Sequence, residues 1–199
     1  MEQKKVLVVD NGTKYMQNLT EKINSHAKEH SKGKKITIDK VDVSKLKSLD
    51  NIKDYDAIIL SGSTHRGHKN TGHDYILKNA KDDAYIVGVC HGHQSIAHIY
   101  GGIVEKLDDY EVGNKEITIT KDDDVIGKKG KMSIYKNHKY AVTELPSELE
   151  VIAESKVGRK TIIEAFKHKT KNIYGIQGHP EKGGKAEQIL YNALNKAYK

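Results

Sequence analysis

The sequence predicts an α/β fold with a central, mostly parallel sheet that helices flank and that antiparallel strands extend in the second half. Three observations lead to this prediction. Short apolar runs that end in polar or glycine residues occur at 6–10, 57–62 and 85–90, as in strands that are buried on both faces of a parallel sheet. Segments with helical periodicity lie between these runs. After Gly102 the pattern changes to strand-like segments separated by turns.

Helices are expected to connect the buried strands of the first half. Apolar residues from Tyr15 to Ile23 recur at helical spacing, and this helix is expected to stop near Gly33. A weaker pattern at 75–80 predicts a second helix after the 62–73 loop. A repeated order of strand and helix implies right-handed crossovers between parallel strands.

The second half is expected to add antiparallel strands to the same sheet. The strand-like segments are 103–107, 116–120, 140–144, 150–154, 161–166 and 172–177. A last helix is expected from about Gly184 to Ala197. No repeat, linker or shift in composition divides the chain, and 199 residues suffice for a full core, so residues 1–199 are expected to form a single domain.

Composition narrows the class of protein. The net charge of +7 comes from 34 Lys+Arg against 27 Asp+Glu, and the lysines are scattered among acidic residues, as on a solvated surface. One Phe and no Trp argue against nucleic-acid binding, which needs stacking aromatics beside a basic stripe. A single cysteine excludes an internal disulfide, and neither a membrane span nor a signal peptide is recognisable. We therefore expect a soluble cytoplasmic protein that binds neither nucleic acid nor membrane.

The single cysteine, Cys90, lies where the strand at 85–90 gives way to a helical pattern at 94–100. The segment 88–92, Gly-Val-Cys-His-Gly, has the pattern of a nucleophile elbow, in which flanking glycines permit a sharp turn from strand to helix. Free N–H groups at a helix N-terminus stabilise a thiolate, and they could also stabilise an oxyanion. A buried structural cysteine is the alternative that this turn alone leaves open.

A partner for the cysteine is expected at the end of the strand at 172–177. His179 can take up the thiol proton and return it to a leaving amine, and Glu181 can orient the imidazole. Residues two apart point the same way in an extended chain, and Pro180 fixes the backbone between them.

The eleven histidines raise the alternative of a metal site. No H-E-x-x-H pattern occurs, and a lone cysteine cannot form a zinc knuckle, so no metal or other cofactor is expected. His65, His68 and His73 are instead expected to be solvated in their loop, and His93 or His98 is expected to pack on the helix that follows Cys90.

Taken together, these segments resemble the class I, or triad-type, glutamine amidotransferases. The G-x-C-x-G-x-Q signature of that family is present at 88–94, and its His-Pro-Glu motif is present at 179–181. "ILSGS" at 59–63 is similar to the oxyanion loop of the family, and "YKNHKYAV" at 135–142 resembles its Ser-His-x-Asp-x-Val segment. The resemblance covers nearly the whole chain and implies the flavodoxin-like class I glutamine amidotransferase fold.

The resemblance implies hydrolysis of the side-chain amide of glutamine through a γ-glutamyl thioester on Cys90. His179 would be general base and then general acid, and Glu181 would be the orienting carboxylate. The chain has no phosphate-binding loop such as G-x-x-x-x-G-K-[ST], so the ammonia is expected to pass to a separate ATP-dependent synthetase.

Further positions receive a role only from the resemblance. Backbone N–H groups of Gly62 and His91 would form the oxyanion hole, in a loop that also holds Ser63. Gln94 would contact the substrate glutamine. His138 matches the partner-facing histidine of the family and is assigned to the interface with the synthetase.

Within the family, three segments are most similar to the glutaminase subunit of archaeal GMP synthetase, which supplies ammonia for the conversion of XMP to GMP. They are "VVDNGTKY" at 8–15, "YEVGNKEI" at 110–117 and the segment 162–181. Residues 8–19 are also similar to the glutaminases of anthranilate and aminodeoxychorismate synthases. A stand-alone γ-glutamyl hydrolase and a non-catalytic or redox relative on the same scaffold are further alternatives, although the intact His-Pro-Glu motif favours catalysis.

Five positions around the predicted pocket depart from the family pattern. Ser63 and Thr64 stand where Gly-Pro is usual, and a positive φ at Ser63 would strain the loop. His91 replaces Leu or Tyr, Tyr140 replaces an acidic residue, and Gly178 replaces Phe. These changes predict either activation by a partner or a different γ-glutamyl substrate.

Overall fold

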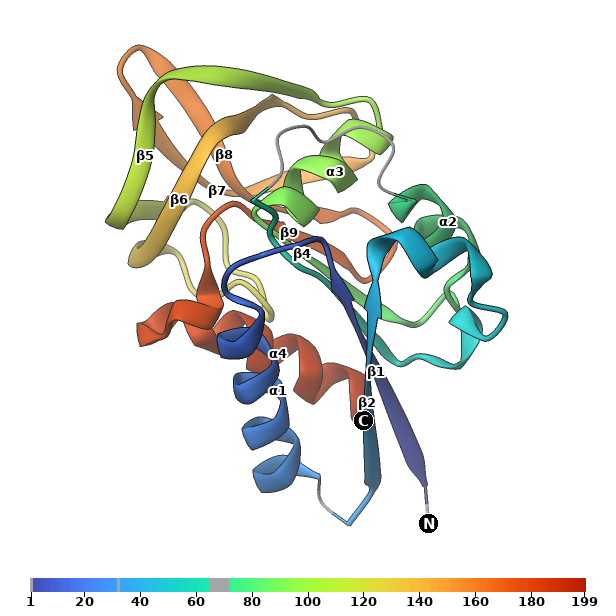
Figure 1. The fold of residues 1–199 in the computed structure, drawn as a ribbon. Coiled ribbons are helices and arrows are strands. Elements are labelled where there is room, and N and C mark those ends of the chain that lie inside the picture. Colours follow the sequence, from blue (N-terminus) through green and yellow to red (C-terminus); the bar gives the residue numbers. More distant parts are fainter. Residues whose placement is uncertain (1, 32, 65–71) are drawn as a thin grey trace.

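The protein, described by a computed structural model over residues 2–31, 33–64 and 72–199, is built on one mixed sheet (Figure 1). Within these residues the sheet has nine strands in the order β2-β1-β3-β4-β9-β8-β7-β5-β6. Neighbouring strands from β2 to β9 in this order run parallel, and all later pairs are antiparallel. This is the α/β architecture that the sequence predicts, with the antiparallel part formed by the second half of the chain.

The parallel half contains the three predicted buried strands, β2, which the sequence analysis missed, and β9, which was expected to be antiparallel but pairs parallel with β4. The strands are β1 (Gln3–Asp10), β2 (Lys35–Asp42), β3 (Ala57–Leu60), β4 (Tyr85–Val89) and β9 (Ile173–Ile176). All of β3 is buried, whereas β2 is a largely exposed edge strand that pairs with β1 over its whole length. Exposure explains the omission, because β2 lacks a continuous apolar run.

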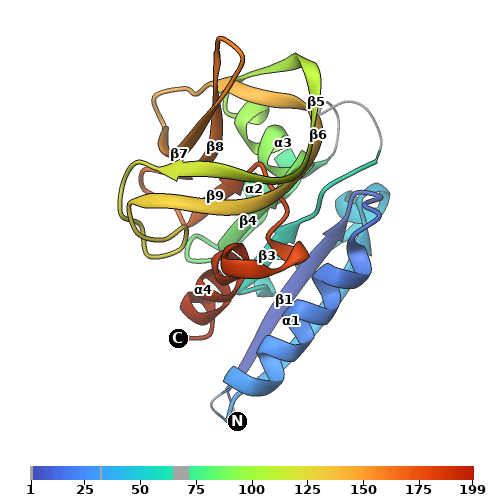
Figure 2. The same cartoon turned by 90° about the vertical axis from the view of Figure 1, so that its left-hand side faces the viewer.

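Helices cover both faces of the parallel half (Figure 2). On one face, α1 (Met16–His30) and α4 (Gln188–Ala197) pack on Val6 and Val8 of β1. On the other face, α2 (His73–Asn79) and α3 (His91–Ile99) pack on Leu7 and Val9. Strand β1 therefore sends alternate side chains into two separate cores. Short 3₁₀ helices at Val43–Ser48, Ile52–Asp54, Pro180–Lys182 and Gly184–Glu187 complete these layers.

The antiparallel half is formed by β5 (Ile103–Ile119), β6 (Gly130–Glu144), β7 (Leu149–Val157) and β8 (Lys160–His168). The predicted segments 103–107 and 116–120 belong to one long strand, β5, which pairs with β6 along an irregular register that shifts between Lys106 and Glu111. In Figure 1 the β5–β6 hairpin curves away from the parallel half. No helix in the described ranges is long and apolar enough to cross a membrane.

One lysine is buried, although the sequence predicts that the lysines are solvated. Lys136 of β6 is only 1% exposed, and its ammonium group forms an ion pair with the carboxylate of Glu164 on β8. Ser155 Oγ lies 3.2 Å from the same ammonium, and Glu111 Oε2 lies 3.6 Å from it. The antiparallel half is therefore held partly by a buried charge cluster.

Candidate active site

Cys90 lies at the sharp turn from β4 into α3. Its backbone has φ 49° and ψ −96°, and it is the only non-glycine residue of the described chain with a positive φ. The Cys90 N–H donates to the Ile176 carbonyl of β9 over 2.8 Å, and the Cys90 carbonyl accepts from Gln94 N–H over 3.1 Å. The strain of such a conformation costs about 1–3 kcal/mol and persists only where the surroundings impose it. The predicted elbow is present.

The two glycines of the elbow are needed because backbones approach each other there. A Cβ on Gly88 would lie 2.5 Å from the carbonyl carbon of Gly92. A Cβ on Gly92 would lie 2.4 Å from the carbonyl oxygen of Leu60. Strands β3 and β4 and the first turn of α3 therefore pack backbone against backbone, which holds Cys90 rigidly.

His179 and Glu181 follow β9, the strand next to β4. The His179 Nδ1 atom lies 2.8 Å from Glu181 Oε1, and both side chains are buried. Pro180 and Glu181 form a 3₁₀ turn rather than the extended chain we expected, yet the pair forms. The Tyr15 ring packs against the imidazole in a T-shaped arrangement at a centroid distance of 4.8 Å. The hydrogen bond with Glu181 therefore fixes the orientation of the His179 imidazole.

The segment at the end of β3 is the third that approaches Cys90 and His179, beside the segments that follow β4 and β9. A Cβ on Gly62 would lie 3.1 Å from His179 Cε1 and 3.7 Å from the Cys90 Cβ. Burial lowers the pKa of His179, but the Cys90 sulfur and the Glu181 carboxylate outweigh it and raise that pKa to about 10. No described residue forms a well-aligned hydrogen bond with the buried His179 Nε2 atom, although the Cys90 sulfur interacts with the ring.

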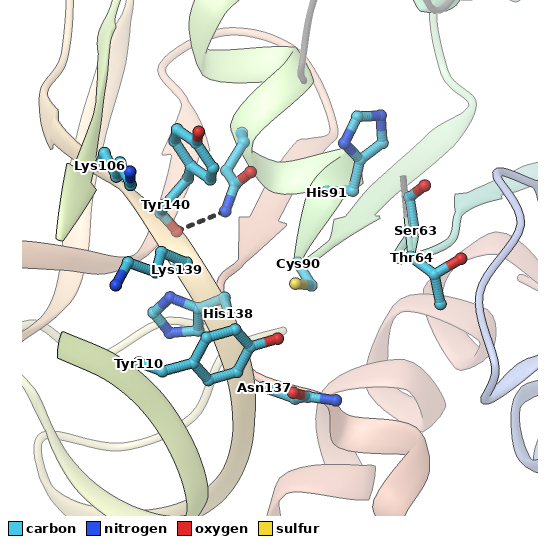
Figure 3. Close-up of a pocket in the computed structure, with 11 residues that line it drawn as sticks. Ser63, Thr64, Cys90, His91, Lys106, Tyr110, Asn137, His138, Lys139 and Tyr140 are labelled. Atoms are coloured by element: carbon cyan, nitrogen blue, oxygen red, sulfur yellow. Dashed lines mark hydrogen bonds between the residues drawn. The ribbon is translucent and has the colours of Figure 1, made fainter. Parts of the chain in front are cut away.

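Cys90 opens into a cavity of about 550 Å³, within the size range of small-molecule sites (Figure 3). Figure 3 shows the sulfur between Ser63, Thr64 and His91 on one side and His138 and Tyr140 on the other. None of the described lining residues is acidic, and two are lysines. The lining residues are Ser63, Thr64, Cys90, His91, Gln94, Lys106, Tyr110, Asn137, His138, Lys139 and Tyr140.

Gln94 lies in the cavity wall, where its amide is held by the protein. Its Nε2 donates to the Tyr140 carbonyl over 2.6 Å and to Gln177 Oε1 over 3.2 Å. The Gln177 Nε2 atom in turn lies 3.7 Å from the Cys90 sulfur. The sequence analysis gave Gln177 no role. The sequence feature that could have identified Gln177 is its position, because it is a polar residue at the end of the buried strand that precedes the His-Pro-Glu motif.

The departures at Ser63 and Gly178 are accommodated without the expected strain. Ser63 does not have a positive φ, and the next residue, Thr64, anchors the loop by donating from N–H and Oγ1 to the Gly12 carbonyl. A Cβ on Gly178 would lie 2.6 Å from the Ile134 side chain. Ile134 therefore occupies the space that a side chain at position 178 would need.

The histidines of the 62–73 loop and of the helix after Cys90 have different surroundings. His65 and His68 lie outside the described residues. The expectation that His73 is solvated is wrong, because this residue begins α2 and is fully buried with hydrogen bonds to Ser95 and Asn11. His93 belongs to α3, the helix that follows Cys90, and its ring packs on Phe166 of β8 rather than on α3. No group of three or more metal-ligating side chains is placed to hold an ion within the described ranges.

His138, which we assigned to a partner interface, lies in the wall of the cavity and is only 4% exposed. Neither ring nitrogen has a hydrogen-bond partner among the described residues. Burial and the nearby Lys136 ammonium lower the pKa of His138 to about 3, so the ring is neutral at physiological pH. Any contact with a partner would reach this ring only through the mouth of the cavity.

Comparison with known proteins gives evidence on the family that does not depend on the geometry of the site. A family model described as glutamine amidotransferase class-I matches residues 7–197. The glutamine-hydrolyzing GMP synthase subunit of Methanocaldococcus jannaschii is 32% identical over 177 residues, which are 88% of this chain and 87% of that protein. The protein of the same name from Methanothermobacter thermautotrophicus is 36% identical over 130 residues, 65% of this chain and 67% of its own.

Solved structures agree on the fold. A Thermoplasma acidophilum protein described as a GMP synthase subunit superposes with a TM-score of 0.80 at 22% identity, covering 99% of this chain and 95% of its own. A glutamine amidotransferase from Thermotoga maritima superposes with a TM-score of 0.69 at 17% identity, covering 98% of this chain and 83% of its own.

Proposed function

Because the chain belongs to the class I glutamine amidotransferase family, we propose that it is the glutamine-hydrolysing subunit of a GMP synthetase. It would release ammonia from glutamine and pass it to a separate ATP-dependent synthetase that converts XMP to GMP. The archaeal relatives that are named as glutamine-hydrolyzing subunits of GMP synthase support this proposal. We place this activity in the cytoplasm and in a single domain of residues 1–199.

One observation carries the catalytic part of the proposal. Strands β4 and β9 are parallel neighbours, and Cys90 follows one while His179 follows the other. The carboxyl ends of parallel strands meet at one edge of a sheet, where α/β proteins bind their ligands. A strained cysteine therefore faces a histidine that a buried glutamate already orients.

In the first half of the reaction, the Cys90 sulfur attacks the side-chain carbonyl carbon of glutamine. The proton on the His179 ring is the one that the thiol gave up before the attack, and the raised pKa of His179 holds it there at neutral pH. As the tetrahedral intermediate collapses, Nε2–H gives its proton to the leaving amine, the C–N bond breaks and ammonia departs. A γ-glutamyl thioester remains on Cys90.

In the second half, His179 takes a proton from water, and the resulting hydroxide attacks the thioester carbonyl. The C–S bond breaks and glutamate leaves, so the net reaction consumes one water and yields glutamate and ammonia. In both halves the negative charge on the carbonyl oxygen would be stabilised by the N–H groups of Gly62 and His91. Preorganised donors of this kind contribute about 10²–10³ each in rate.

The cavity offers groups for the remainder of the substrate. Lys139 and Lys106 supply positive charge for the α-carboxylate of glutamine, and Asn137 and His138 supply neutral hydrogen-bonding groups. Ser63 and Gln94 line the wall on the side of the elbow, where they would contact the glutamine side chain. The exposed ring of Tyr110 at the same cavity is 54% accessible and would lie near an incoming synthetase.

The test is release of glutamate from glutamine, measured with and without an ATP-dependent synthetase, ATP and XMP. We expect the unaltered protein with the synthetase to be active and Cys90→Ala to be inactive while its circular dichroism spectrum is unchanged. His168→Gln, on β8 and away from the cavity, is the matched control and should retain activity. Unchanged glutamate release by Cys90→Ala would refute the catalytic assignment.

The same assay separates the competing functions. Steady turnover of γ-glutamyl peptides in preference to glutamine, without any synthetase, would favour a stand-alone hydrolase. Stimulation by a chorismate-dependent synthetase in place of an XMP-dependent one would favour the anthranilate or aminodeoxychorismate type. Either outcome would leave the roles of Cys90 and His179 intact; the first would remove the ammonia acceptor, and the second would change it.

A further inference from the structure

We propose that Gln177, which lies outside the predicted triad, is a further catalytic residue whose side-chain amide donates a hydrogen bond to the Cys90 thiolate and stabilises it for attack. Gln177 directly follows β9, is fully buried, and is not among the described residues that line the cavity. The amide therefore reaches the sulfur from the interior of the protein. The catalytic meaning of this contact rests on the proposed function, because a stabilised thiolate serves the reaction only if Cys90 attacks glutamine.

The Gln177 amide connects the nucleophile to the wall of the cavity. Its Nε2 atom lies 3.7 Å from the Cys90 sulfur, and its Oε1 accepts from Gln94 Nε2 over 3.2 Å. The backbone N–H of Gln177 donates to the Glu164 carbonyl of β8 over 2.7 Å, which holds the main chain in place. A buried side-chain amide needs a partner at its oxygen and at its nitrogen. Gln94 and Cys90 are those two partners.

The hydrogen bonds determine which end of the Gln177 amide faces the sulfur. The Tyr140 carbonyl can only accept, so Gln94 must turn its amide nitrogen toward it, over 2.6 Å (dashed line in Figure 3). The same nitrogen directs its second hydrogen at Gln177, so the atom of Gln177 on that side is the acceptor Oε1. Gln177 therefore presents its N–H group to Cys90, and an N–H group attracts a thiolate whereas an amide oxygen would repel it.

A thiolate at Cys90 needs donors from the protein because water reaches it poorly. Cys90 is only 5% exposed, and a buried charge is costly unless it is paired and hydrogen-bonded. The His179 ring interacts with the sulfur on the triad side. Gln177 supplies a second, neutral donor that does not depend on the protonation of His179. Hydrogen bonding to a charged form favours that form, so removal of the amide should raise the pH at which the thiolate appears.

The experiment uses Gln177→Met, which keeps an unbranched side chain but has no amide donor. Cys90 is the only cysteine of the chain, so the reaction of the protein with a dipyridyl disulfide reports on this residue alone. The thiolate attacks one sulfur of the reagent, the S–S bond breaks, and a coloured thiopyridone leaves. The rate measured against pH gives the midpoint of thiolate formation.

We expect the midpoint to rise by about 1–2 pH units in Gln177→Met, the effect of losing one hydrogen bond to a charged group. The nucleophilicity of thiolates increases with their basicity, with a Brønsted coefficient of about 0.4–0.5. The variant should therefore react about 3–10-fold faster above both midpoints and about 3–15-fold slower below them, so that the two profiles cross. The acid limb of the kcat/KM profile for glutamine, measured with the synthetase, should move by the same amount.

The matched control is Ile173→Met, which places the same side chain at the buried start of β9, about 13 Å along the strand from position 177. Its midpoint should stay within about 0.3 pH unit of that of the unaltered protein. Both variants leave in place the titratable groups of the triad and of the cavity, so a shift reports the amide itself. These groups are His179, Glu181, His91, His138, Tyr110, Tyr140, Lys106 and Lys139.

An unchanged midpoint in Gln177→Met would overturn the inference, and so would a reaction that is slower at every pH, which is the sign of a distorted or blocked site. If Gln177→Met does not fold, Gln94→Leu, which frees the Gln177 amide to flip, must raise the midpoint by at least about 0.5 pH unit. A smaller shift in that variant would also overturn the inference. Failure of the unaltered protein to hydrolyse glutamine, even with its synthetase present, would instead overturn the proposed function; a shifted midpoint would then still establish the hydrogen bond to the thiolate.

Discussion

Replacing Cys90 by glycine should give a more stable protein than replacing it by alanine, the reverse of the usual order. Alanine keeps a Cβ at φ 49° and ψ −96°, a combination outside the small left-handed region that non-glycine residues tolerate. Glycine adopts positive φ without that clash. Both variants lack the sulfur, so neither should hydrolyse glutamine, and the comparison isolates the backbone.

The magnitude follows from three opposing contributions. Relief of the strain stabilises the glycine variant by about 2–3 kcal/mol, toward the upper end of the usual range because ψ also lies outside the left-handed region. The extra freedom of glycine in the unfolded chain costs about 0.5–1 kcal/mol. Loss of one buried methyl group costs about 0.8 kcal/mol. The net difference is about 1 kcal/mol in favour of glycine, which corresponds to about 2–4 °C in Tm for a chain of this size.

Urea unfolding followed by circular dichroism measures the difference directly. Ala97→Gly, in the same helix α3, is the matched control and should be the less stable member of its pair, by about 2 kcal/mol, because its backbone is helical and its buried methyl group is lost. Equal or greater stability of Cys90→Ala relative to Cys90→Gly would refute the claim that the elbow stores backbone strain at the nucleophile.

Three further predictions concern stability, measured by urea unfolding. Lys136→Met should cost about 3–5 kcal/mol because it leaves the Glu164 carboxylate buried without its partner, and adding Glu164→Leu should restore most of the loss. Gly178→Ala should cost about 1–3 kcal/mol by pressing on Ile134, and less when combined with Ile134→Val. Burial lowers the pKa of His93 to about 3, so below pH 6.5 the imidazole takes up a proton in the unfolded chain but not in the folded one. Between pH 6.5 and pH 5 this difference destabilises the folded state by up to about 2 kcal/mol. His93→Gln should remove that destabilisation. An acid dependence in His93→Gln at least as steep as in the unaltered protein would contradict the account of His93. Additive costs would contradict the accounts of the Lys136–Glu164 and Gly178–Ile134 pairs.

The parts of the fold that could be predicted are those whose signal is local. Strands β1, β3 and β4 are recognisable because each contains a short run of apolar residues that is buried on both faces of the sheet. The elbow at Cys90 is recognisable because close backbone packing requires glycine at fixed positions beside it. The His179–Glu181 pair is separated by a single residue, so its members were expected to meet, although they do so through a 3₁₀ turn and not through the extended chain that was predicted.

The parts that escaped prediction depend on partners distant in the chain. Edge strand β2 is held by backbone pairing with β1 and shows no apolar run. His73 is buried because Asn11, 62 residues away, satisfies its ring, and a loop sequence gives no sign of that contact. Lys136 is buried for the same reason, through Glu164. From sequence alone a charged or polar residue is predicted to be solvated, because the tertiary partner that would permit its burial is not known.

Mass spectrometry of the acid-quenched reaction with glutamine and the synthetase tests the central claim most directly. We predict a γ-glutamyl group, labile to hydroxylamine, on the peptide that contains Cys90, and no such group in Cys90→Ala. Glutamate formation without any adduct on Cys90, or with the adduct on another residue, would contradict nucleophilic catalysis at this elbow.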